Sequence, residues 1–465
     1  MTVTRVVVVG ADAAGMSAAH QALRTARKLG RSLQVTALER TPYTSYSACG
    51  IPYWVAGDVA GADDMVVRTP EQHRERGVNL RMGAVATHLD LDARVLTYRD
   101  EVGTERSLPF DELVLATGAA PHVPDWARDD DGSLVPGVHP VKDLGDGEHW
   151  SSVLTADAGR PGRRHAVVLG GGYLGLEMAE AVVRRDWDCT LITRSTVMSS
   201  LDPDMGERIQ SVVEAAGVTV RTHCPIDRLE RGPDGRVAAV LTEDGTSIRA
   251  DAVVLALGVA PSTELGRAAG LPVGASGGYL TAETGRLADG VWAAGDCCEV
   301  RHRVSGRFEF VPLGTHANKQ GRVVGTCLGG GSAAFAGMLG TAITRFAAAG
   351  HEVEVARTGL NVKQAAAAGL DAVAMLSEGR TAAGYMPEGS DLAIKVVAEV
   401  GTRRLLGMQI VGGPGAAKRI DTAAAALWGE LTVDDLVAMD LAYAPPFATV
   451  WEAVQLATRR LADTM

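Results

Sequence analysis

The chain has 465 residues, of which 46% are hydrophobic and 22% are charged. A single hydrophobic core does not organise a chain of this length, so we expect two to four domains. The 56 acidic residues outnumber the 45 basic ones and give a formal net charge of −11, which argues against nucleic acid or an anionic membrane as the main partner. A multidomain enzyme is the class that remains.

The six cysteines form neither a C-x-x-C pair nor a spacing typical of metal ligands. We therefore predict no metal site and no disulfide scaffold. The first apolar run, residues 6–9, is too short for a signal peptide or a membrane span, and no later run reaches that length without charge or frequent glycine. These features predict a reduced, cytoplasmic protein.

A first nucleotide-binding unit is predicted at the N-terminus. The apolar strand 6–9 runs into Gly10, Ala14 and Gly15, and a helical pattern then continues to about residue 28. Asp12 replaces the middle glycine of the usual G-x-G-x-x-G motif. The second strand, residues 33–38, ends at Glu39, where a carboxylate is placed to accept hydrogen bonds from a ribose 2′-hydroxyl.

A second unit follows with the complete motif. Residues 166–169 lead into Gly170, Gly172 and Gly175, which together allow a tight turn and a close approach of a pyrophosphate to the helix N-terminus. The next strand, residues 189–192, ends near Arg194 and Ser195, where a site for NAD usually has an acid. Because arginine can pair with a 2′-phosphate, we predict a preference for NADPH, with NADH as the other candidate.

Two further strands end in a similar way, at Thr117-Gly118 and at Gly258, which indicates that nucleotide-binding modules are duplicated in the chain. A later strand, residues 291–294, ends at Gly295-Asp296. The position of this aspartate suits a carboxylate that hydrogen-bonds the ribityl chain of a flavin.

Cys49 is the predicted redox centre. It stands alone in the stretch 45–53, with no second cysteine within several positions, and Pro52 marks a helix start just after it. Free backbone N–H groups and the helix dipole at such a start favour a thiolate, the form that attacks disulfides. The alternative is a buried structural cysteine.

Together, these motifs resemble the pyridine nucleotide-disulfide oxidoreductases, which bind FAD and NAD(P)H. The single cysteine in a C-G-I-P-Y context is similar to the branch of coenzyme A-disulfide reductases, NAD(P)H oxidases and persulfide reductases. The resemblance implies an α/β fold with two Rossmann-like domains and a C-terminal α+β dimerisation domain. We assign residues 1–120 and 261–335 to the FAD domain, 121–260 to the NAD(P)H domain and 336–465 to dimerisation. A homodimer with active sites shared across the interface is expected.

The resemblance also implies roles for individual residues. Cys49 and Tyr443 would be catalytic, with Tyr443 supplied to the partner's site; Tyr385 would act likewise, although a plain packing role stays open because the usual Tyr-Tyr-Pro-Gly is Tyr-Met-Pro-Glu here. The implied cofactor-binding residues are Gly10, Ala14, Gly15, Glu39, Arg40, Ser47, Thr117, Gly118, Gly170, Gly172, Tyr173, Leu174, Gly175, Glu177, Arg194, Ser195, Gly258, Gly295, Asp296 and Ala317.

The expected reaction passes electrons from NADPH through FAD to Cys49 and on to a small disulfide such as coenzyme A disulfide, or to a persulfide. The positions that would bind substrate by resemblance are Ser17, Gln21, Arg24 and Ser45, while Arg24, Arg74 and Arg76 could grip a phosphate or be surface charges. Ala48 and Asn318 depart from the coenzyme A pattern, and Trp451 would suit a bulkier disulfide or a persulfide.

Two other functions stay open from the sequence. One is an NAD(P)H oxidase or peroxidase that works through a sulfenic acid at Cys49, and the other is a non-catalytic flavoprotein that senses oxidation. Adjacent Cys297 and Cys298 could be a second redox pair, but adjacent cysteines form strained disulfides, and packing near the flavin is the alternative.

Overall fold

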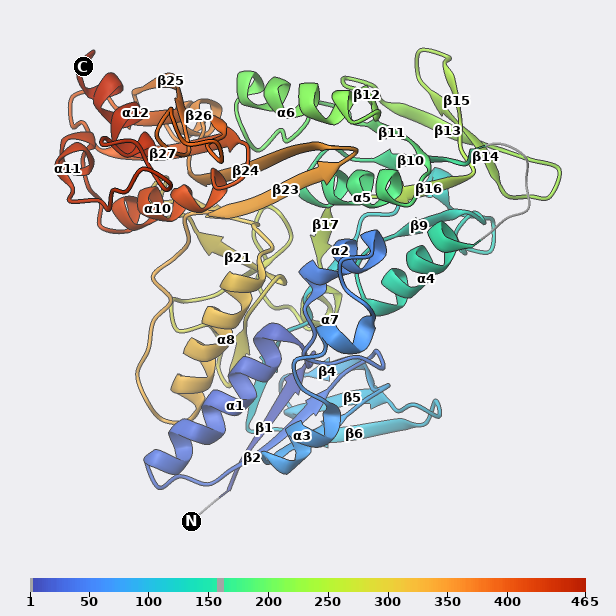
Figure 1. Ribbon diagram of the computed structural model, residues 1–465. Helices are drawn as coiled ribbons and strands as arrows, with labels where there is room; N and C mark the ends of the chain where they lie inside the picture. Colours follow the sequence, from blue (N-terminus) through green and yellow to red (C-terminus); the bar gives the residue numbers. More distant parts are fainter. Residues whose placement is uncertain (1–2, 157–162) are drawn as a thin grey trace.

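A computed structural model describes residues 3–156 and 163–465 of the chain. Figure 1 shows three parts: the N-terminal part at the bottom, a green part at the upper right and an orange-to-red C-terminal part at the upper left. The described residues form three large sheets with helices packed on them, which confirms the predicted mixed α/β architecture.

The first sheet has the strand order β19-β20-β7-β1-β2-β3. Its strands are β1 (Thr4–Val9), β2 (Leu33–Leu38), β3 (Val78–Arg81), β7 (Glu112–Leu115), β19 (Arg286–Ala288) and β20 (Val291–Ala293). All neighbours are parallel except β19 and β20. Because β19 and β20 come from much later in the chain, this nucleotide-binding domain is split in sequence, as the resemblance implies.

Helix α8 (Gly314–Leu328) also returns to the first domain and packs on α1 (Ala13–Lys28). Two glycines permit this close approach. A Cβ atom on Gly321 would lie 2.2 Å from the carbonyl oxygen of Ala14, and one on Gly325 would lie 2.3 Å from that of Ala18. The glycines therefore let the two helix backbones meet behind the first glycine turn.

The second sheet has the all-parallel order β12-β11-β10-β16-β9. Its strands are β9 (Val138–Pro140), β10 (His165–Leu169), β11 (Asp188–Ile192), β12 (Thr219–Arg221) and β16 (Ala252–Leu255), accompanied by helices α4 (Leu144–Thr155), α5 (Tyr173–Arg184) and α6 (Pro203–Ala215). The chain enters and leaves this domain through the antiparallel pair β8 (Ala119–Pro121) and β17 (Val259–Pro261). The predicted boundaries at 120 and 260 fall within these two strands and remain proposals.

The third sheet is antiparallel, with the order β23-β24-β27-β26-β25. Its strands are β23 (Ala342–Ala348), β24 (His351–Gly359), β25 (Ala372–Arg380), β26 (Asp391–Glu399) and β27 (Leu405–Gly412). Helices α10 (Ile420–Trp428) and α12 (Ala453–Ala462) contact it, and α11 (Val433–Ala438) packs on α12. The strand-like stretches 392–397 and 406–412 of the sequence lie in β26 and β27.

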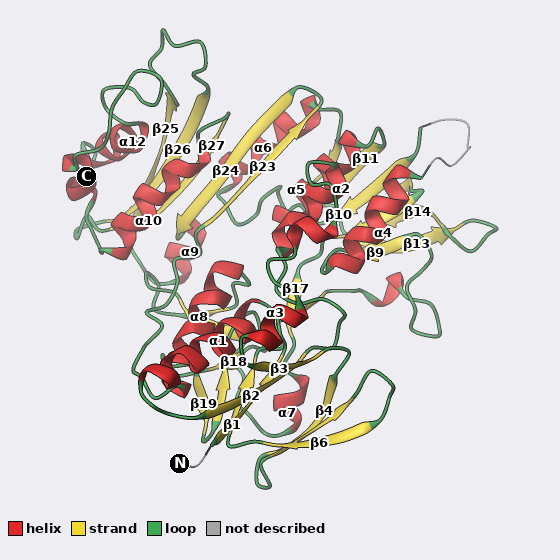
Figure 2. Cartoon of the chain, turned by 60° about the horizontal axis from the view of Figure 1, so that its bottom comes forward, coloured by secondary structure: helices red, strands yellow, loops and turns green. Residues whose placement is uncertain are grey.

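Smaller elements lie around these sheets, and Figure 2 labels most of them. They are α2 (Ile51–Ala56), α3 (Pro70–Glu75), α7 (Glu264–Ala268), α9 (Val362–Ala367), β4 (Val85–Asp90), β5 (Val95–Arg99), β6 (Glu105–Pro109), β13 (Ile226–Arg231), β14 (Val237–Thr242), β15 (Ser247–Arg249), β18 (Tyr279–Leu280), β21 (Cys298–Arg301) and β22 (Phe308–Glu309). None of the helices formed by residues 3–156 and 163–465 is long and apolar enough to cross a membrane.

Candidate active site

The first glycine turn connects β1 to α1. Gly10 has a φ of +96°, and a Cβ atom there would lie 2.1 Å from the carbonyl oxygen of Ala116, so only glycine fits. Glu39 is buried at the end of β2, as predicted. Its Oε2 accepts a 2.9 Å hydrogen bond from the Ala11 backbone N–H, and its Oε1 accepts one from Thr41. Glu39 thus stabilises the turn, and its contact with a ribose stays a prediction.

The second glycine turn connects β10 to α5 and is more open. Gly170 has a φ of +114°, and a Cβ atom on Gly175 would lie 1.7 Å from the Gly170 carbonyl oxygen. Gly172, in contrast, has no heavy atom within 4 Å of its Cβ position. Free space beside the start of a 12-residue helix suits a pyrophosphate. Arg194 and Ser195 are exposed just beyond β11.

Arg40 and Ser47, two further predicted cofactor-binding residues, are exposed on the segment between β2 and Cys49. The other predicted flavin-binding residues lie where the split domain closes. Gly118 and Gly258 have φ values of +67° and +89°, with open space at their Cβ positions. A Cβ atom on Gly295 would lie 2.8 Å from that of Ala14 and 3.6 Å from that of Ala317. The first glycine turn, Gly295 and α8 therefore converge. Thr117 donates a 2.5 Å hydrogen bond to the Ser262 carbonyl oxygen and ties the two crossing strands together.

Asp296 follows this convergence point, and its side chain is partly buried. Burial raises the pKa of the Asp296 carboxyl, and the positive charge of Lys142 opposes the shift. Lys142 also opposes the raised pKa values of Asp12 and Cys49, so this one ammonium group acts on all three. The sequence analysis missed Lys142 because it stands in the other domain, outside any motif. An open cradle of glycines with a carboxylate and a cation at its end fits a flavin dinucleotide.

Cys49 lies in a single 3-10 turn, Ala48–Gly50, immediately before α2. The residue is exposed to solvent, yet protein surrounds the thiol on several sides. This partial desolvation raises the pKa of the Cys49 thiol, and the carboxyl groups of Glu177 and Asp296 raise it further. The helix start is where the sequence predicted it. A backbone hydrogen bond at Cys49 lowers the pKa of the thiol as expected, but burial and the two carboxyl groups outweigh it, so the protein groups around Cys49 favour the thiol.

Glu177 and Glu180 connect α5 to the third sheet. The hydroxyl of Thr344 on β23 donates a 2.7 Å hydrogen bond to Oε1 of Glu177, and the Ala347 N–H donates a 2.8 Å bond to Oε2 of Glu180. Burial raises the pKa of Glu177 to about 7, and nearby Glu180 adds to the shift. A carboxyl group that titrates near neutral pH therefore stands close enough to Cys49 to influence its charge. Tyr173 and Leu174 are partly buried in the first turn of the same helix.

The predicted substrate residues lie on α1 and on the loop before Cys49. The Ser17 hydroxyl donates a 2.8 Å hydrogen bond to Oδ1 of Asn318, and Gln21 donates to Thr25. Arg24 is exposed on the next turn of the helix. The three positions therefore lie along α1, but the side chains of Ser17 and Gln21 already hydrogen-bond other residues of the protein.

Ser45 is held by a pair of histidines that the sequence analysis did not identify. Its backbone has a φ of +46°, and its hydroxyl lies 2.9 Å from Nε2 of fully buried His73. Nδ1 of His73 lies 2.7 Å from Nε2 of His20 on α1. The two rings stack with a centroid distance of 5.0 Å. No spacing rule links residues 20, 45 and 73 in the sequence. Only the folded structure shows that these three side chains form a hydrogen-bonded series.

Arginines surround the histidine pair. Burial lowers the pKa of His20 to about 4, and the charges of Arg68, Arg76 and Arg24 lower it further. For Arg74 the structure favours the surface-charge alternative, because its guanidinium contacts Glu71 at 3.1 Å and the Leu80 carbonyl oxygen. The basic patch near Ser45 therefore consists of Arg24, Arg68 and Arg76.

The two predicted tyrosines lie on the surface of the third domain. Tyr385 is 74% exposed and Tyr443 is 47% exposed, and their loops are joined by a 2.9 Å hydrogen bond from the Ala383 N–H to the Pro445 carbonyl oxygen. Phe447 and Trp451 are exposed on the same stretch. An exposed group of aromatic side chains of this kind is typical of a protein interface.

The adjacent cysteines are packed in the core of the first domain. Cys297 and Cys298 are buried, with their sulfur atoms 3.9 Å apart and not bonded. The Cys297 thiol lies 3.4 Å from the carbonyl oxygens of Leu115 and Ala294. This arrangement supports the packing alternative over a second redox pair.

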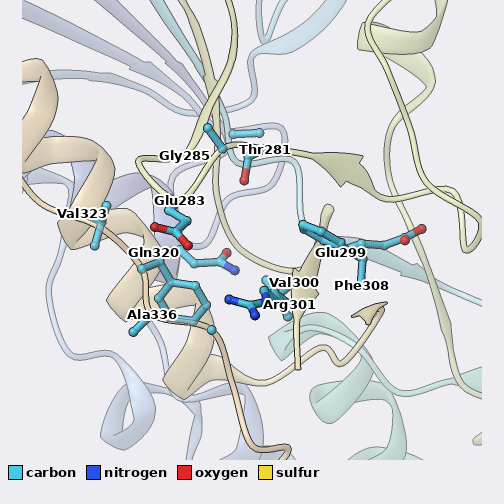
Figure 3. A pocket seen from close by; sticks show the side chains of 14 residues that line it. Thr281, Glu283, Gly285, Glu299, Val300, Arg301, Phe308, Gln320, Val323 and Ala336 are labelled. Carbon is cyan, nitrogen blue, oxygen red and sulfur yellow. The ribbon is translucent and has the colours of Figure 1, made fainter. Parts of the chain in front are cut away.

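A separate cavity of about 180 Å³ lies between α8 and β21, and Figure 3 shows its lining. The side chains of Glu283, Gln320 and Arg301 point into it. Gln320 also accepts a 2.6 Å hydrogen bond from the Gly295 N–H, which connects the cavity wall to the cofactor cradle. Cys49 does not line this cavity, so we assign the cavity no part in the reaction.

The chain belongs to the pyridine nucleotide-disulphide oxidoreductase family. The family's main domain matches residues 4–321, and its dimerisation domain matches residues 348–454. This membership confirms the prediction of an enzyme that uses FAD and NAD(P)H, and it argues against the non-catalytic reading of Cys49.

Individual relatives carry related names. A protein of Pyrococcus abyssi named "NAD(P)H sulfur oxidoreductase (CoA-dependent)" is 35% identical over 460 residues, covering 98% of both chains. An "NADH oxidase" of Methanocaldococcus jannaschii is 30% identical, covering 97% of both chains. The structure of an NAD-dependent persulfide reductase from A. fulgidus superimposes with a TM-score of 0.91 at 31% identity, covering 99% of this chain and 83% of the other.

Proposed function

We propose that the protein passes electrons from NADPH to a small disulfide through Cys49. The observation that carries the proposal is the placement of Cys49, the one cysteine classed as exposed, within the electrostatic reach of Glu177 on the NAD(P)H helix and of Asp296 at the flavin cradle. When bound, FAD supplies the two-electron relay between the nucleotide and the cysteine.

The balanced reaction assigns each step to a group of this chain. The Cys49 thiolate attacks one sulfur of the substrate disulfide, forms a mixed disulfide and releases the other half as a thiolate, which takes a proton. Two electrons from NADPH then cleave the mixed disulfide, release the second thiol and restore Cys49. In total, one NADPH, one proton and one disulfide give NADP⁺ and two thiols.

Because the surrounding protein raises the pKa of the Cys49 thiol, forming the attacking thiolate requires help. Lys142 provides a positive charge that lowers this pKa. Glu177 titrates near neutral pH and is placed to hold a proton during the cycle. Lys142 and Glu177 together control the charge of the Cys49 thiol.

The substrate is proposed to carry phosphate groups, as coenzyme A disulfide or a coenzyme A persulfide does. The basic patch of Arg24, Arg68 and Arg76 lies around the His20–His73 pair, and His73 in turn contacts Ser45, four residues before Cys49. Arginine binds phosphate through paired N–H donors. The name of the Pyrococcus abyssi relative, which includes coenzyme A dependence, supports the same substrate class.

The proposed assembly is a homodimer. The matched dimerisation domain and the exposed aromatic side chains around Tyr443 support a second copy as the occupant of this surface. Each copy would then place Tyr443 and Tyr385 at the partner's site. The proposed location is cytoplasmic, because a free thiol at Cys49 needs a reducing compartment.

The test is anaerobic NADPH oxidation by the FAD-loaded protein, with coenzyme A disulfide compared with pantethine, a disulfide without phosphate groups. We expect kcat/KM to be at least about 10-fold higher for coenzyme A disulfide, because each charge-assisted contact contributes about 1.5–3 kcal/mol. Arg68→Ala should reduce that ratio, whereas Arg74→Ala, whose guanidinium contacts Glu71, should leave it unchanged. Equal kcat/KM values for both disulfides would exclude the phosphate-bearing class.

The second candidate function is an NAD(P)H oxidase, favoured by the name of the Methanocaldococcus jannaschii relative. The same preparation in air, without disulfide, tests it. Rapid NADPH oxidation only in air would move the assignment to oxygen reduction through a Cys49 sulfenic acid.

A further inference from the structure

Two surface loops carry the exposed tyrosines of the third domain. Residues 381–390 connect β25 to β26 and contain Tyr385, while residues 439–452 connect α11 to α12 and contain Tyr443. The direct backbone contact between the loops is the hydrogen bond from the Ala383 N–H to the Pro445 carbonyl oxygen. The side chains of Tyr385 and Tyr443 also interact with each other. Because both contacts run from one loop to the other, a further connection is needed to fix the pair of loops to the rest of the domain.

Arg419, which lies directly before α10, provides that connection. It ends a short 3-10 turn, Ala417–Arg419. One terminal nitrogen, Nη2, donates to the carbonyl oxygen of Thr381 at 2.6 Å and to that of Phe447 at 2.5 Å. Thr381 lies four residues before Tyr385, and Phe447 lies four residues after Tyr443. A single guanidinium therefore bridges the bases of both tyrosine loops.

The rest of the guanidinium is fixed as well. Nε donates a 2.6 Å hydrogen bond to Oε1 of Glu452, and Nη1 donates to the Gly415 carbonyl oxygen. The side chains of Arg419 and Glu452 are only 14% and 13% exposed, so solvent screens the pair weakly. Glu452 also caps α12 by accepting a 2.6 Å bond from the Val454 N–H. Arg419 is thus anchored to the domain core.

The chemistry requires arginine at this position. A planar guanidinium can direct N–H groups to a carboxylate and to carbonyl oxygens on two sides at once, whereas a lysine ammonium is a single point with no fixed fork. Hydrogen bonds from a charged donor are each worth about 1.5–3 kcal/mol. Losing the fork would therefore release at least one tyrosine loop without removing the positive charge.

We propose that Arg419 is a positioning residue that aligns the loops of Tyr385 and Tyr443 for the active site of a second copy of this chain. The inference rests on the proposed function, in which these tyrosines complete the partner's site. Arg419 itself touches neither substrate nor cofactor. Its effect should appear in the disulfide step and not in the reduction of the bound flavin by NADPH.

The test compares Arg419→Lys with Arg403→Lys in the FAD-loaded full chain. Arg403 lies in the same domain, and its guanidinium donates two hydrogen bonds to Asp434 and one to the Ala462 carbonyl oxygen. Among the described residues, it makes no hydrogen bond to either tyrosine loop. We expect Arg419→Lys to lower kcat for disulfide turnover about 10-fold, with the rate of anaerobic flavin reduction by NADPH within about twofold of wild type. Arg403→Lys should change neither rate.

Two further measurements separate positioning from general damage. In a Tyr385→Phe/Tyr443→Phe background, adding Arg419→Lys should cause little additional loss of kcat, because the residues act through one another. Arg419→Gly, with added guanidinium ion, should regain part of its disulfide turnover. A full additional loss in the double-phenylalanine background, or an effect no larger than that of Arg403→Lys, would overturn the inference.

Failure of the inference can be told apart from failure of the proposed function. If Cys49→Ser keeps disulfide turnover, the proposed function is wrong whatever Arg419 does. If Cys49→Ser is inactive while Arg419→Lys turns over disulfide at the wild-type rate, only the positioning role of Arg419 is rejected.

Discussion

The hydroxyl of Thr344 donates a 2.7 Å hydrogen bond to Oε1 of Glu177, and this contact joins the dimerisation sheet to the helix that begins at the NAD(P)H glycine turn. Glu177 in turn raises the pKa of the Cys49 thiol. Elements from all three domains therefore influence the charge of one sulfur atom.

The first prediction concerns this influence. Glu177→Gln removes a negative charge near Cys49, so the pKa of the thiol should fall and its alkylation by iodoacetamide should reach half-maximal rate at a lower pH. Thr344→Val removes a bond that favours the Glu177 carboxylate, so the pKa of Glu177 should rise above about 7. Less negative charge then remains on Glu177 at neutral pH. The pKa of the Cys49 thiol should therefore fall, by a smaller amount than in Glu177→Gln.

The matched control is Thr341→Val, which removes a 2.7 Å threonine–threonine hydrogen bond to Thr358 in the same domain. It should leave the alkylation profile unchanged. A higher pH midpoint for Cys49 in Glu177→Gln would show that the assigned direction of the charge effect is wrong.

The second prediction concerns Asp12 in the first glycine turn. Burial raises the pKa of its carboxyl to about 6, and Glu39 adds to the shift. A raised pKa means that the folded state favours the neutral carboxyl, so its stabilising contribution is complete below about pH 4 and is lost as the pH rises through about 6. Asp12→Asn should therefore gain thermal stability relative to wild type as the pH rises from about 4 to about 6.5.

A shift of about two units corresponds to at most about 3 kcal/mol. The measurement is the melting temperature of both proteins across this pH range. A constant difference in melting temperature between the variant and wild type would mean that the Asp12 carboxyl does not titrate there.

The third prediction separates the two kinds of glycine in the second turn. Gly172→Ala meets open space and has ordinary backbone angles, so the protein should fold with little change in melting temperature but show a KM for NADPH raised about 10-fold or more. Gly170→Ala would place its Cβ atom 2.1 Å from the Ala256 carbonyl oxygen and should destabilise the fold itself. An unchanged KM in Gly172→Ala would place the pyrophosphate elsewhere.

The fourth prediction concerns nucleotide choice. Arg194 is exposed beyond the end of β11, where a 2′-phosphate would lie. Arg194→Ala should raise the KM for NADPH about 10-fold and leave that for NADH unchanged. Steady-state kinetics with both nucleotides gives the answer, and an equal change for both would reject the proposed NADPH preference.

The sequence predicted best what depends on local backbone geometry. The turns at Gly10 and Gly170 need glycine for steric reasons that act within one strand-turn-helix unit, so their pattern is readable from the chain. The strand that precedes each turn, α1, and β26 and β27 of the third sheet lie where they were expected.

What the sequence could not show depends on contacts between distant segments. The pKa of Cys49 responds to Glu177, Asp296 and Lys142, which come from three separate parts of the chain. Which arginines form the basic patch also depends on the fold: Arg74 contacts Glu71, whereas Arg68 lies near the His20–His73 pair. The role of Arg419 depends on two loops that only the folded third domain brings together.

The most direct measurement is anaerobic rapid mixing of NADPH with the FAD-loaded wild type and Cys49→Ser, each followed by addition of coenzyme A disulfide. The proposed function predicts that both proteins show reduction of the bound flavin at similar rates, and that only wild type then turns over disulfide. Sustained disulfide turnover by Cys49→Ser would contradict the central role of this cysteine.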